Sequence, residues 1–470
     1  MRSFRLPLQI SERKTLLVAV DLLLVNSAVL VALRLWTLRD PLRPFSQEFV
    51  LSQAHWFLIL TAIWSLAAFL NDFYNPGMAD NLRSSGVALL RVTVLELLAY
   101  LIIYFFFPPQ SLPRGVVLYH GAVSFALVAV WRGAYLFLLS RAPFQSRAIV
   151  AGAGWAGRTI VRAIRENANS PYRLLGYIDD DPAKQGQIIE GVPVVGTRHD
   201  LLSLVKDNDV SEVILAIARD MHGDLIQAIM DCQEQGIRVT PMQHLYEEIT
   251  RRIPVEHIGD QWSLILPMEH AGTGTFLPPL KRAMDLLIAG IGLLILALLF
   301  PFLALAIYLD SPGPIFYTQE RVGQGGRVFR VFKFRSMIPH AEGDNDPIWA
   351  QENDARVTPV GRFLRRTMID ELPQFINVLR GEMSIVGPRP ERPIFADQLA
   401  EKIPFYRARH AVKPGMAGWA LINYGYSSSV RDALIRLQYD LYYIKHQSIW
   451  LDLLVLLRTL GAMVTLKGRG

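Results

Sequence analysis

The sequence contains a single cysteine, Cys232, among 470 residues. One thiol excludes an intramolecular disulfide framework and any zinc site built from several cysteines. Charged residues make up only 19% of the chain, whereas hydrophobic residues make up 51%. Disordered chains have the opposite balance. The sequence is therefore that of a folded protein, and its length allows about two to four domains.

The net charge of +6 comes from the C-terminal part of the chain. Residues 281–470 contain 24 Lys and Arg against 17 Asp and Glu, whereas the first 280 residues contain 24 against 25. A basic region favours an anionic partner, such as nucleic acid, membrane phosphate or a phosphorylated substrate. The charge excess alone does not choose among these partners.

Four long apolar runs dominate the first 140 residues. They cover residues 15–36, 49–70, 87–107 and 116–139. Each run reaches the ~20 residues that a membrane helix needs. A buried helical bundle in a soluble protein is the alternative, but four such runs in succession are hard to bury. Basic residues before the first run and after the fourth place both ends in the cytoplasm. We predict a four-helix transmembrane bundle over residues 1–142.

A glycine motif of the form G-x-G-x-x-G follows a short apolar strand expected at residues 147–151. Its glycines are Gly152, Gly154 and Gly157. Strand, glycine loop and helix in this order let backbone N–H groups meet a phosphate. Aspartates at 179–181 follow the next expected strand, where a ribose-binding acid would lie. The alternative is that the glycines only permit a tight turn. We predict an α/β Rossmann-like domain at residues 143–270 and leave nucleotide binding open.

A further apolar run covers residues 284–309 and contains Pro301. Proline removes a helical hydrogen bond and kinks a helix. A straight span would put everything after residue 310 outside the cell. A helix broken at Pro301 could instead enter and leave the membrane on the same face. The apolar pattern leaves both topologies open.

Adjacent carboxylates, Asp370 and Glu371, lie among cations in the basic region. They precede an expected helix with Pro373 in its first turn and Gly381 just past its end. An isolated Asp-Glu pair in this position usually caps the helix. Here, arginines and rigid Pro/Gly segments flank the pair, which favours a phosphate site with a metal-binding anion. The candidate phosphate-binding cations are Lys333, Arg335, Arg365, Arg389 and Lys413.

An expected strand with the sequence F-K-F-R-S-M carries two of these cations, Lys333 and Arg335. Side chains two residues apart in a strand share a face. We therefore predict that both cations point to the same side, with the phenylalanines on the other.

Residues 279–470 resemble the bacterial sugar transferase superfamily, the monotopic phosphoglycosyl transferases. The matching elements are the Pro-containing membrane helix, F-K-F-R-S-M, I-D-E-L-P-Q-x-x-N-V-L-R-G, V-G-P-R-P and K-P-G-M-A-G-W-A. With four apolar runs and a Rossmann-like region in front, the whole chain is similar to the large form of that family. One departure is the pair Phe300-Pro301, where the family's membrane helix often breaks at Ser-Pro.

The resemblance implies a membrane protein with a monotopic α/β catalytic domain at residues 271–470. Its re-entrant helix would cover residues 281–309, with the domain on the cytoplasmic face of the bacterial inner membrane. The implied partners are a UDP-sugar, undecaprenyl phosphate and membrane lipid, and no nucleic acid. A homodimer and polysaccharide-assembly proteins are further candidate partners.

The resemblance also implies a reaction that begins a repeat unit of exopolysaccharide or capsule. Hexose 1-phosphate would move from the UDP-sugar to undecaprenyl phosphate, releasing UMP. Glucose is the expected sugar and galactose the alternative. Asp370 would be the nucleophile that forms an aspartyl phosphosugar, and Mg²⁺ would be bound by Asp370 and Glu371. Asp440 resembles an acid position of the family, and Arg321 is a further candidate site residue.

Two other classes of function compete with this interpretation. One is an NAD-dependent nucleotide-sugar dehydratase or epimerase run by the Rossmann-like region, but no Tyr-x-x-x-Lys pair follows the glycine motif within that region. The other is a membrane assembly scaffold. A scaffold alone leaves the Asp-Glu constellation unexplained.

Overall fold

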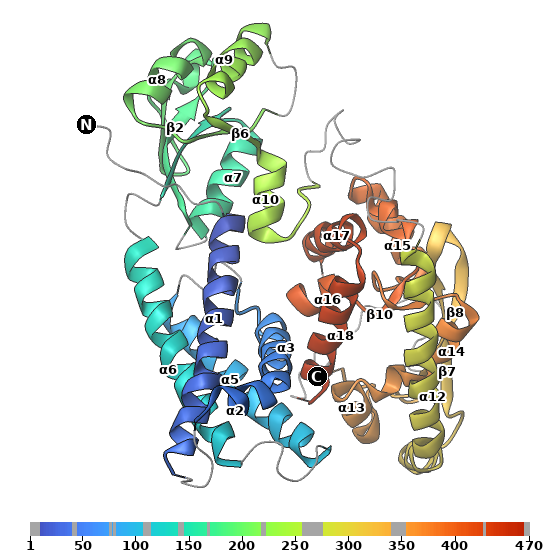
Figure 1. The fold of residues 1–470 in the computed structure, drawn as a ribbon. Helices are drawn as coiled ribbons and strands as arrows, with labels where there is room; N and C mark the ends of the chain where they lie inside the picture. Colours follow the sequence, from blue (N-terminus) through green and yellow to red (C-terminus); the bar gives the residue numbers. More distant parts are fainter. Residues whose placement is uncertain are drawn as a thin grey trace. The chain divides into compact units, whose positions relative to one another are not determined.

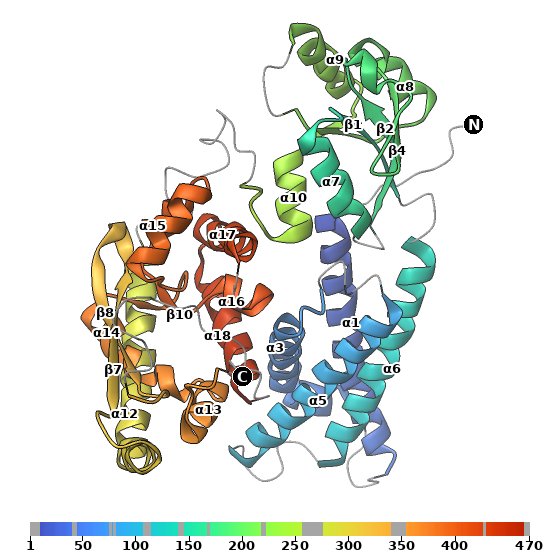
Figure 2. The same ribbon diagram turned by 180° about the vertical axis from the view of Figure 1, so that it is seen from behind.

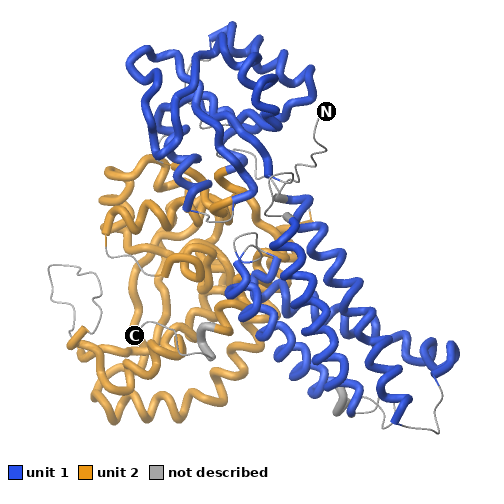
Figure 3. Tube along the Cα trace, turned by 90° about the vertical axis from the view of Figure 1, so that its left-hand side faces the viewer, with its two compact units in different colours: residues 1–245 blue, residues 246–470 orange. Residues whose placement is uncertain are grey.

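The computed structural model describes residues 10–39, 45–74, 78, 81–106, 114–139, 145–166, 170–217, 222–255, 276–339, 354–425 and 429–464. The chain divides into two compact units, residues 1–245 and 246–470 (Figure 3). The domain boundaries predicted at residues 142 and 270 both lie outside the described residues.

The first unit begins with apolar helices (Figure 1). They are α1 (Ile10–Thr37), α2 (Gln47–Ser52), α3 (Ala54–Leu70), α5 (Leu82–Phe106) and α6 (Arg114–Leu139). Among the described residues, four helices are long and apolar enough to cross a membrane: α1, α5, α6 and α12 (Leu277–Asp310) of the second unit. This length and composition mark the chain as a membrane protein.

The predicted apolar run at residues 49–70 is not one helix. Gln53 ends α2 and begins α3, so the apolar helix α3 has only 17 residues. At 1.5 Å per residue, that is about 26 Å, somewhat less than the ~30 Å hydrocarbon core of a bilayer. The prediction overestimated this helix because hydropathy alone does not register the break at Gln53.

Charged residues of the apolar helices pair with one another inside the bundle. Arg132 of α6 donates to Asp21 of α1 at 2.7 Å, and His120 lies 3.1 Å from Glu96. All four side chains are buried. Ionisable residues in membrane helices normally face the protein interior and pair in this way. These charges therefore hold helices together and do not argue against a membrane location.

A six-stranded sheet follows the helices along the chain, with the strand order β3-β4-β2-β1-β5-β6. Its strands β1, β2 and β4 are labelled in Figure 2. All neighbouring pairs are parallel except β3 and β4. The strands are β1 (Ser146–Ala151), β2 (Tyr172–Ile178), β3 (Ile188–Ile189), β4 (Val192–Gly196), β5 (Glu212–Leu215) and β6 (Arg238–Pro241). The accompanying helices are α7 (Trp155–Glu166), α8 (Leu201–Asp207) and α9 (Gly223–Glu234), with short 3₁₀ turns η2 (Pro182–Lys184) and η3 (Arg198–Asp200). The predicted α/β character is thus present, and the strand expected at residues 147–151 corresponds to β1.

The second unit combines short strands with helices. Its helices after α12 are α13 (Pro359–Arg366), α14 (Phe375–Arg380), α15 (Pro393–Lys402), α16 (Trp419–Tyr424), α17 (Val430–Lys445) and α18 (Ile449–Val464). Its 3₁₀ turns are η4 (Gln324–Gly326), η5 (Ile369–Gln374) and η6 (Tyr406–Ala411). Strands β7 (Phe316–Val322) and β8 (Val328–Phe334) form an antiparallel hairpin, and β9 (Ser384–Val386) pairs in parallel with β10 (Gly415–Ala417).

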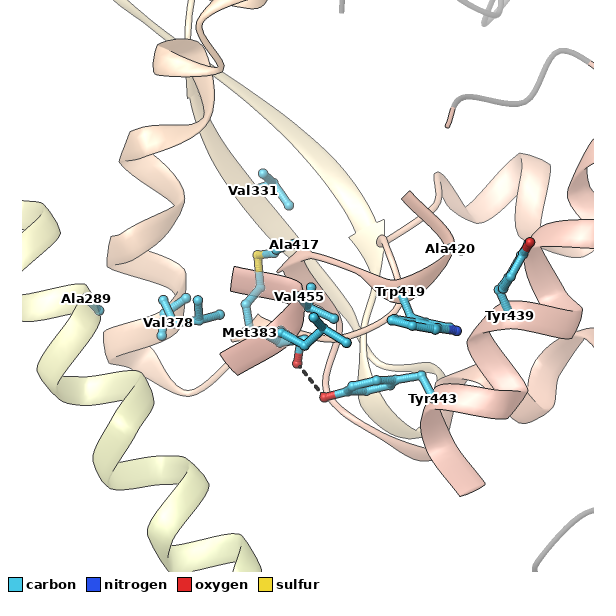
Figure 4. Close-up of a cluster of buried hydrophobic side chains, with 13 residues drawn as sticks. Ala289, Val331, Val378, Met383, Ala417, Trp419, Ala420, Tyr439, Tyr443 and Val455 are labelled. Atoms are coloured by element: carbon cyan, nitrogen blue, oxygen red, sulfur yellow. Dashed lines mark hydrogen bonds between the residues drawn. The ribbon is translucent and has the colours of Figure 1, made fainter. Parts of the chain in front are cut away.

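An apolar cluster at the centre of this unit joins α12, α14, the β9–β10 pair and the last three helices (Figure 4). Its fully buried members include Trp419, Tyr443 and Val455. The aromatic side chains carry most of the buried apolar area in such a cluster. This core fixes the strands that lead into the site described below.

The start of α12 is bonded to α14, and its end is bonded to α13. Near its start, Arg282 donates to the carbonyls of Val378 and Leu379 in α14, at 2.7 and 2.8 Å. At its end, the Asp310 carboxylate accepts from the Val360 N–H of α13 at 3.0 Å. Pro301 lies within the helix, whose ribbon changes direction along its length (Figures 1 and 2).

Residues 246–255, which follow the sheet, belong to the second unit by their contacts. Glu247 of α10 (Met242–Thr250) accepts from Lys445 at 2.7 Å, and the Ile253 N–H donates to the Gln438 carbonyl at 3.1 Å. Trp419 donates to the Arg251 carbonyl at 3.4 Å. The unit that contains the predicted catalytic domain therefore begins before residue 271.

Candidate active site

The two carboxylates lie in the first turn of the 3₁₀ segment η5, directly after α13. The turn between the two elements places Met368 at φ 58°, in the left-handed region that non-glycine residues rarely adopt. Pro373 is inside η5, two residues before α14, and so not in the first turn of the α-helix as predicted. Gly381 ends α14 with φ 80°, which confirms its predicted position.

Helix capping does not explain the acidic pair. Met368 occupies the N-cap position of η5, and no side chain caps this turn. Gln374 occupies the N-cap position of α14, again without a side-chain bond. The Glu371 carboxylate instead turns toward two cations.

Glu371 is held between Lys333 of β8 and Arg389 of the segment after β9. The Lys333 ammonium donates to Oε1 at 2.9 Å, and Arg389 reaches Oε1 at 2.8 Å and Oε2 at 3.4 Å. Burial alone would raise the pKa of Glu371, but Arg389 and Lys333 outweigh it and hold that pKa well below its usual value. Glu371 is therefore an anion whose charge is largely balanced by the protein.

Asp370 is in a different environment. Its side chain is buried and accepts no hydrogen bond from the described part of the chain. Burial, and then the adjacent Glu371 charge, raise the pKa of Asp370 to about 6, against the attraction of Lys333, Arg365 and Arg389. Two neighbouring carboxylates with pKa values pushed apart commonly have two different roles. Asp370 is thus the acid of the pair that accepts no hydrogen bond from a cation among the described residues.

Asn377 of α14 aligns β8 with the acidic segment. Its side-chain oxygen accepts from the Phe332 N–H at 3.1 Å, and its amide donates to the Arg330 carbonyl at 2.7 Å. These bonds fix the strand one residue before Lys333, so the ammonium meets Glu371. Asn377 is the asparagine of the motif that contains the acids.

The loop at residues 387–391, which carries Arg389, is held through its own backbone. Four of its carbonyl groups accept hydrogen bonds. Backbone N–H groups donate two of them, from Gly415 to Pro388 and from Val322 to Glu391, both at 2.9 Å. Arginine side chains donate the other two, from Arg409 to Arg389 at 3.0 Å and from Arg321 to Pro390 at 3.2 Å. A Cβ on Gly387 would come within 2.4 Å of the Lys413 carbonyl. Glycine is thus required where β9 and the segment before β10 approach each other. The Pro/Gly motifs build a rigid support for Arg389.

Asp440 and Arg321, the two further candidates, act on this loop and not on the acids. Asp440 accepts from Arg409 at 2.7 Å, and Arg409 in turn donates to the Arg389 carbonyl. Arg321 donates to the Pro390 carbonyl. Sequence reasoning missed Arg409, because it lies in no recognised motif and is defined only by these tertiary contacts.

The other three predicted cations, Arg365, Arg335 and Lys413, lie apart from the Glu371 carboxylate and from one another. Arg365 donates to Ser336 at 2.9 Å and lies close enough to Asp370 to lower its pKa. Arg335 follows the last residue of β8 and donates to the carbonyls of Ser311 and Pro312 at the end of α12. Lys333 and Arg335 thus have different partners, since Lys333 binds Glu371 and Arg335 binds the end of α12. The Lys413 ammonium lies beside Gly381 and Arg282 and contacts neither acid among the described residues.

The donor set suits a metal only in part. Among the described residues, no group of three or more His, Cys, Asp or Glu side chains could hold an ion. Mg²⁺ is usually held by one or two carboxylates together with substrate phosphates and water. Asp370 and Glu371 fit that mode, whereas an all-protein cage is absent from the described residues.

The glycine motif of the first unit forms a tight strand-to-helix turn. Gly152 has φ 106°, and a Cβ on Gly157 would lie 2.0 Å from the Gly152 carbonyl oxygen. Gly154 has open space around it. The Ala153 N–H donates to Asp179 at 2.8 Å, and Lys184 pairs with that same carboxylate at 3.1 Å. One loop amide is thus occupied by a protein carboxylate, and the turn alone explains two of the glycines.

Fold and site together define a membrane protein whose second unit holds a buried Asp370 next to a partly buried Glu371 that is paired with two cations. Residues 277–466 match the bacterial sugar transferase family, and residues 69–241 match a CoA-binding domain. The chain is 40% identical over 196 residues to the exopolysaccharide production protein PSS of Rhizobium leguminosarum bv. phaseoli, covering 41% of this chain and 98% of that protein. The chain belongs to the bacterial sugar transferase family.

Longer relatives resemble the chain over part of their length. The UDP-N-acetylgalactosamine-undecaprenyl-phosphate N-acetylgalactosaminephosphotransferase of Aeromonas hydrophila is 47% identical over 186 residues, which is 40% of this chain and 44% of that protein. The UDP-glucose:undecaprenyl-phosphate glucose-1-phosphate transferase of Xanthomonas campestris pv. campestris is 33% identical over 307 residues, which is 65% of this chain and 61% of that protein. The chain thus aligns with less than two thirds of either relative.

Proposed function

We propose that this protein transfers hexose 1-phosphate from a UDP-sugar to undecaprenyl phosphate and releases UMP. The observation that carries the proposal is the contrast between the two acids: Asp370 accepts no hydrogen bond from the described residues, whereas Glu371 is paired with Lys333 and Arg389. The relatives named as undecaprenyl-phosphate sugar phosphotransferases support this reaction.

The first chemical step is attack by an Asp370 oxygen on the phosphorus that bears the sugar. A bond forms between Asp370 and phosphorus, and the bond from phosphorus to UMP breaks, with UMP leaving as an anion. In the second step, a phosphate oxygen of the lipid attacks the same phosphorus and displaces Asp370. The carboxylate is regenerated and no proton is consumed. Covalent catalysis of this kind divides one difficult transfer into two easier ones.

The cations around the pair offset the repulsion between a carboxylate and a diphosphate. Arg389 and Lys333 neutralise Glu371, and Arg365 lies near Asp370. Arginine suits bidentate contact with phosphate oxygens, whereas lysine acts as a point charge. Mg²⁺ held by Asp370 and Glu371 would supply further charge neutralisation at the diphosphate. Lys413 and Arg335 contact neither acid among the described residues, and we keep them as proposed phosphate-binding cations.

The sugar is the open part of the proposal. We propose glucose, with galactose as the alternative, and one relative is named for N-acetylgalactosamine. The test incubates purified full-length protein, Mg²⁺ and undecaprenyl phosphate with a panel of UDP-sugars and measures UMP. We expect UMP release to be fastest with UDP-glucose. A UDP-sugar other than UDP-glucose as the best donor would refute the glucose assignment, and no UMP with any donor would refute the reaction.

We propose further that α12 is re-entrant and that the second unit faces the cytoplasm of the bacterial inner membrane. Support comes from the bonds at both ends of α12 to α14 and α13, since a straight 34-residue helix would separate its ends by about 51 Å. Leu296 and Ile307, on either side of Pro301, also belong to one buried cluster with Phe334. We propose that the sheet of the first unit is a Rossmann-like domain on the same side.

Single-cysteine labelling tests this topology. Cys232 is the sole cysteine, so Cys232→Ala supplies a background without thiols. Arg282→Cys and Arg327→Cys should react with a membrane-impermeant maleimide only after the cells are permeabilised. Glu48→Cys, which follows the first span, should react in intact cells and serves as the control. Labelling of Arg327→Cys in intact cells would contradict the re-entrant helix.

A further inference from the structure

A closed network of buried polar groups lies at the start of α12, separate from the acidic pair. The Lys281 ammonium donates to Asp452 at 2.6 Å, to the Val386 carbonyl at 3.0 Å and to the Tyr443 hydroxyl at 3.1 Å. The Tyr443 hydroxyl lies 2.6 Å from the other Asp452 oxygen. The Asp452 side chain is 0% exposed and that of Lys281 is 12% exposed. Every proton of the ammonium thus has an acceptor, and both carboxylate oxygens have a donor.

These three side chains come from α12, α17 and α18, and two of them, Lys281 and Tyr443, lie within hydrogen-bonding distance of the Val386 carbonyl of β9, at 3.0 and 3.1 Å. One helical turn after Lys281, Asp285 accepts from the Ser384 hydroxyl and from the Ile385 N–H, both at 2.9 Å. Three consecutive residues of β9 are therefore bound to the same face of α12. Buried ion pairs contribute little net stability compared with well-packed apolar side chains. Stability alone therefore does not account for this charged network. Its bond to Val386, close to the loop that carries Arg389, indicates a role in positioning that loop.

Val386 is the residue directly before the loop that carries Arg389. Between them, the Gly387 N–H donates to Ala417 at 2.9 Å and the Pro388 carbonyl accepts from Gly415. Proline restricts φ, and both neighbouring peptide groups are bonded, so this short connection has little freedom. A shift of Val386 would move the guanidinium that holds Glu371.

We propose that Lys281, Asp452 and Tyr443 form a clamp through which the membrane helix sets the geometry of the Arg389–Glu371 pair. Lys281 and Asp452 are then positioning residues for the transfer reaction. The inference rests on the proposed function, because the pair matters only if it serves catalysis. Through the clamp, the bonds between α12 and β9 determine the position of the Glu371 carboxylate.

A second buried ion pair supplies a matched control. Lys445 of α17 donates to Glu247 at 2.7 Å, and these side chains are 18% and 7% exposed. This pair also anchors α17, but neither residue bonds to β9 or to the loop at 387–391. Lys281→Met and Lys445→Met therefore each remove one partly buried lysine, and only the first removes a bond to Val386.

The test is a double-mutant cycle with Arg389→Lys, which keeps the charge and loses the bidentate geometry. We expect Lys281→Met to lower kcat for UMP release by about ten- to a hundredfold, with a smaller change in KM, because misplacement by about 1 Å has that cost. In the Arg389→Lys background the same change should cost less than about threefold, because the geometry is already lost. Lys445→Met should lower kcat by one common factor in both backgrounds. An equal loss from Lys281→Met in both backgrounds would overturn the clamp.

Hydrogen exchange supplies a readout that does not depend on activity. The peptide covering residues 384–391 should exchange faster in Lys281→Met than in the unaltered protein, and at an unchanged rate in Lys445→Met. Tyr443→Phe removes only the hydroxyl and should also speed exchange in this peptide, but by a smaller factor. This variant serves as the test if Lys281→Met does not fold. Unchanged exchange in Tyr443→Phe and Lys281→Met would contradict the clamp. An unaltered protein that releases no UMP would instead contradict the proposed function.

Discussion

Replacing Asp370 with asparagine should abolish sugar-phosphate transfer, lowering the rate by more than about a thousandfold. An amide is a poor nucleophile, and it has nearly the same size as the carboxylate it replaces. Incubation of the unaltered enzyme with UDP-sugar and Mg²⁺, without lipid, should leave a hexose phosphate on the peptide that contains Asp370. The measurements are UMP release and mass spectrometry of that peptide. Asp397→Asn, at an exposed position of the same unit, is the control and should keep its activity.

The same substitution should not weaken the fold. The pKa of Asp370 is raised to about 6 from a usual value of 3.8, so the folded protein holds this proton more tightly than the unfolded chain. Stability therefore falls as the pH rises through that window, and at pH 7 the ionised Asp370 destabilises the folded protein. Without metal or substrate, Asp370→Asn should melt at a higher temperature than the unaltered protein at pH 7. The difference should shrink as the pH falls below about 6.

Two results would contradict the nucleophile. One is near-normal transfer by Asp370→Asn. The other is a ternary-complex rate law with no adduct, which would indicate direct attack by the lipid phosphate on the UDP-sugar. A covalent route predicts ping-pong kinetics, with UMP leaving before the acceptor binds.

Glu371→Gln should lower both the rate and the stability, unlike the change at Asp370. Glutamine removes the anion that balances Lys333 and Arg389, and leaves two largely buried cations without their partner. We expect transfer to slow by about a hundredfold or more and the Mg²⁺ requirement to rise. The melting temperature should fall at pH 7. Because the pKa of Glu371 is depressed, the stability that it contributes is present above its usual pKa and is lost on acidification.

Charge balance can be tested directly in that variant. Adding Lys333→Met to Glu371→Gln removes one of the two unbalanced cations and should restore part of the lost stability, but not the rate. Glu401→Gln, on the exposed surface of α15, should match the unaltered protein in both measurements. Normal rates and normal Mg²⁺ dependence in Glu371→Gln would contradict the assigned role.

Local patterns were incomplete where tertiary contacts decide the outcome. Alternation predicted a shared face for Lys333 and Arg335, but it did not predict that Lys333 binds Glu371 whereas Arg335 binds the end of α12. Hydropathy predicted one helix at residues 49–70, but Gln53 divides it. Neither strand alternation nor hydropathy contains the tertiary contacts that decide which group a side chain binds or where a helix is interrupted.

Features that depend on neighbours along the chain were determined by the sequence alone. The apolar runs give the membrane character, because spanning a bilayer requires only length and hydropathy. The glycine spacing indicates the strand-to-helix turn, and the adjacency of Asp370 and Glu371 needs no folding. The Pro/Gly motifs likewise indicate rigid backbone near the site.

Only the tertiary structure decided which cations meet which acid. Lys333 and Glu371 are 38 residues apart, and Arg389 and Glu371 are 18 apart. Arg409 acquires its role through a bond to the Arg389 carbonyl, and Lys281 lies 171 residues from its partner Asp452. Burial then separated the two carboxylates, because desolvation and nearby charges act on them differently. Such differences arise from distances and solvent exclusion, which exist only once the chain has packed.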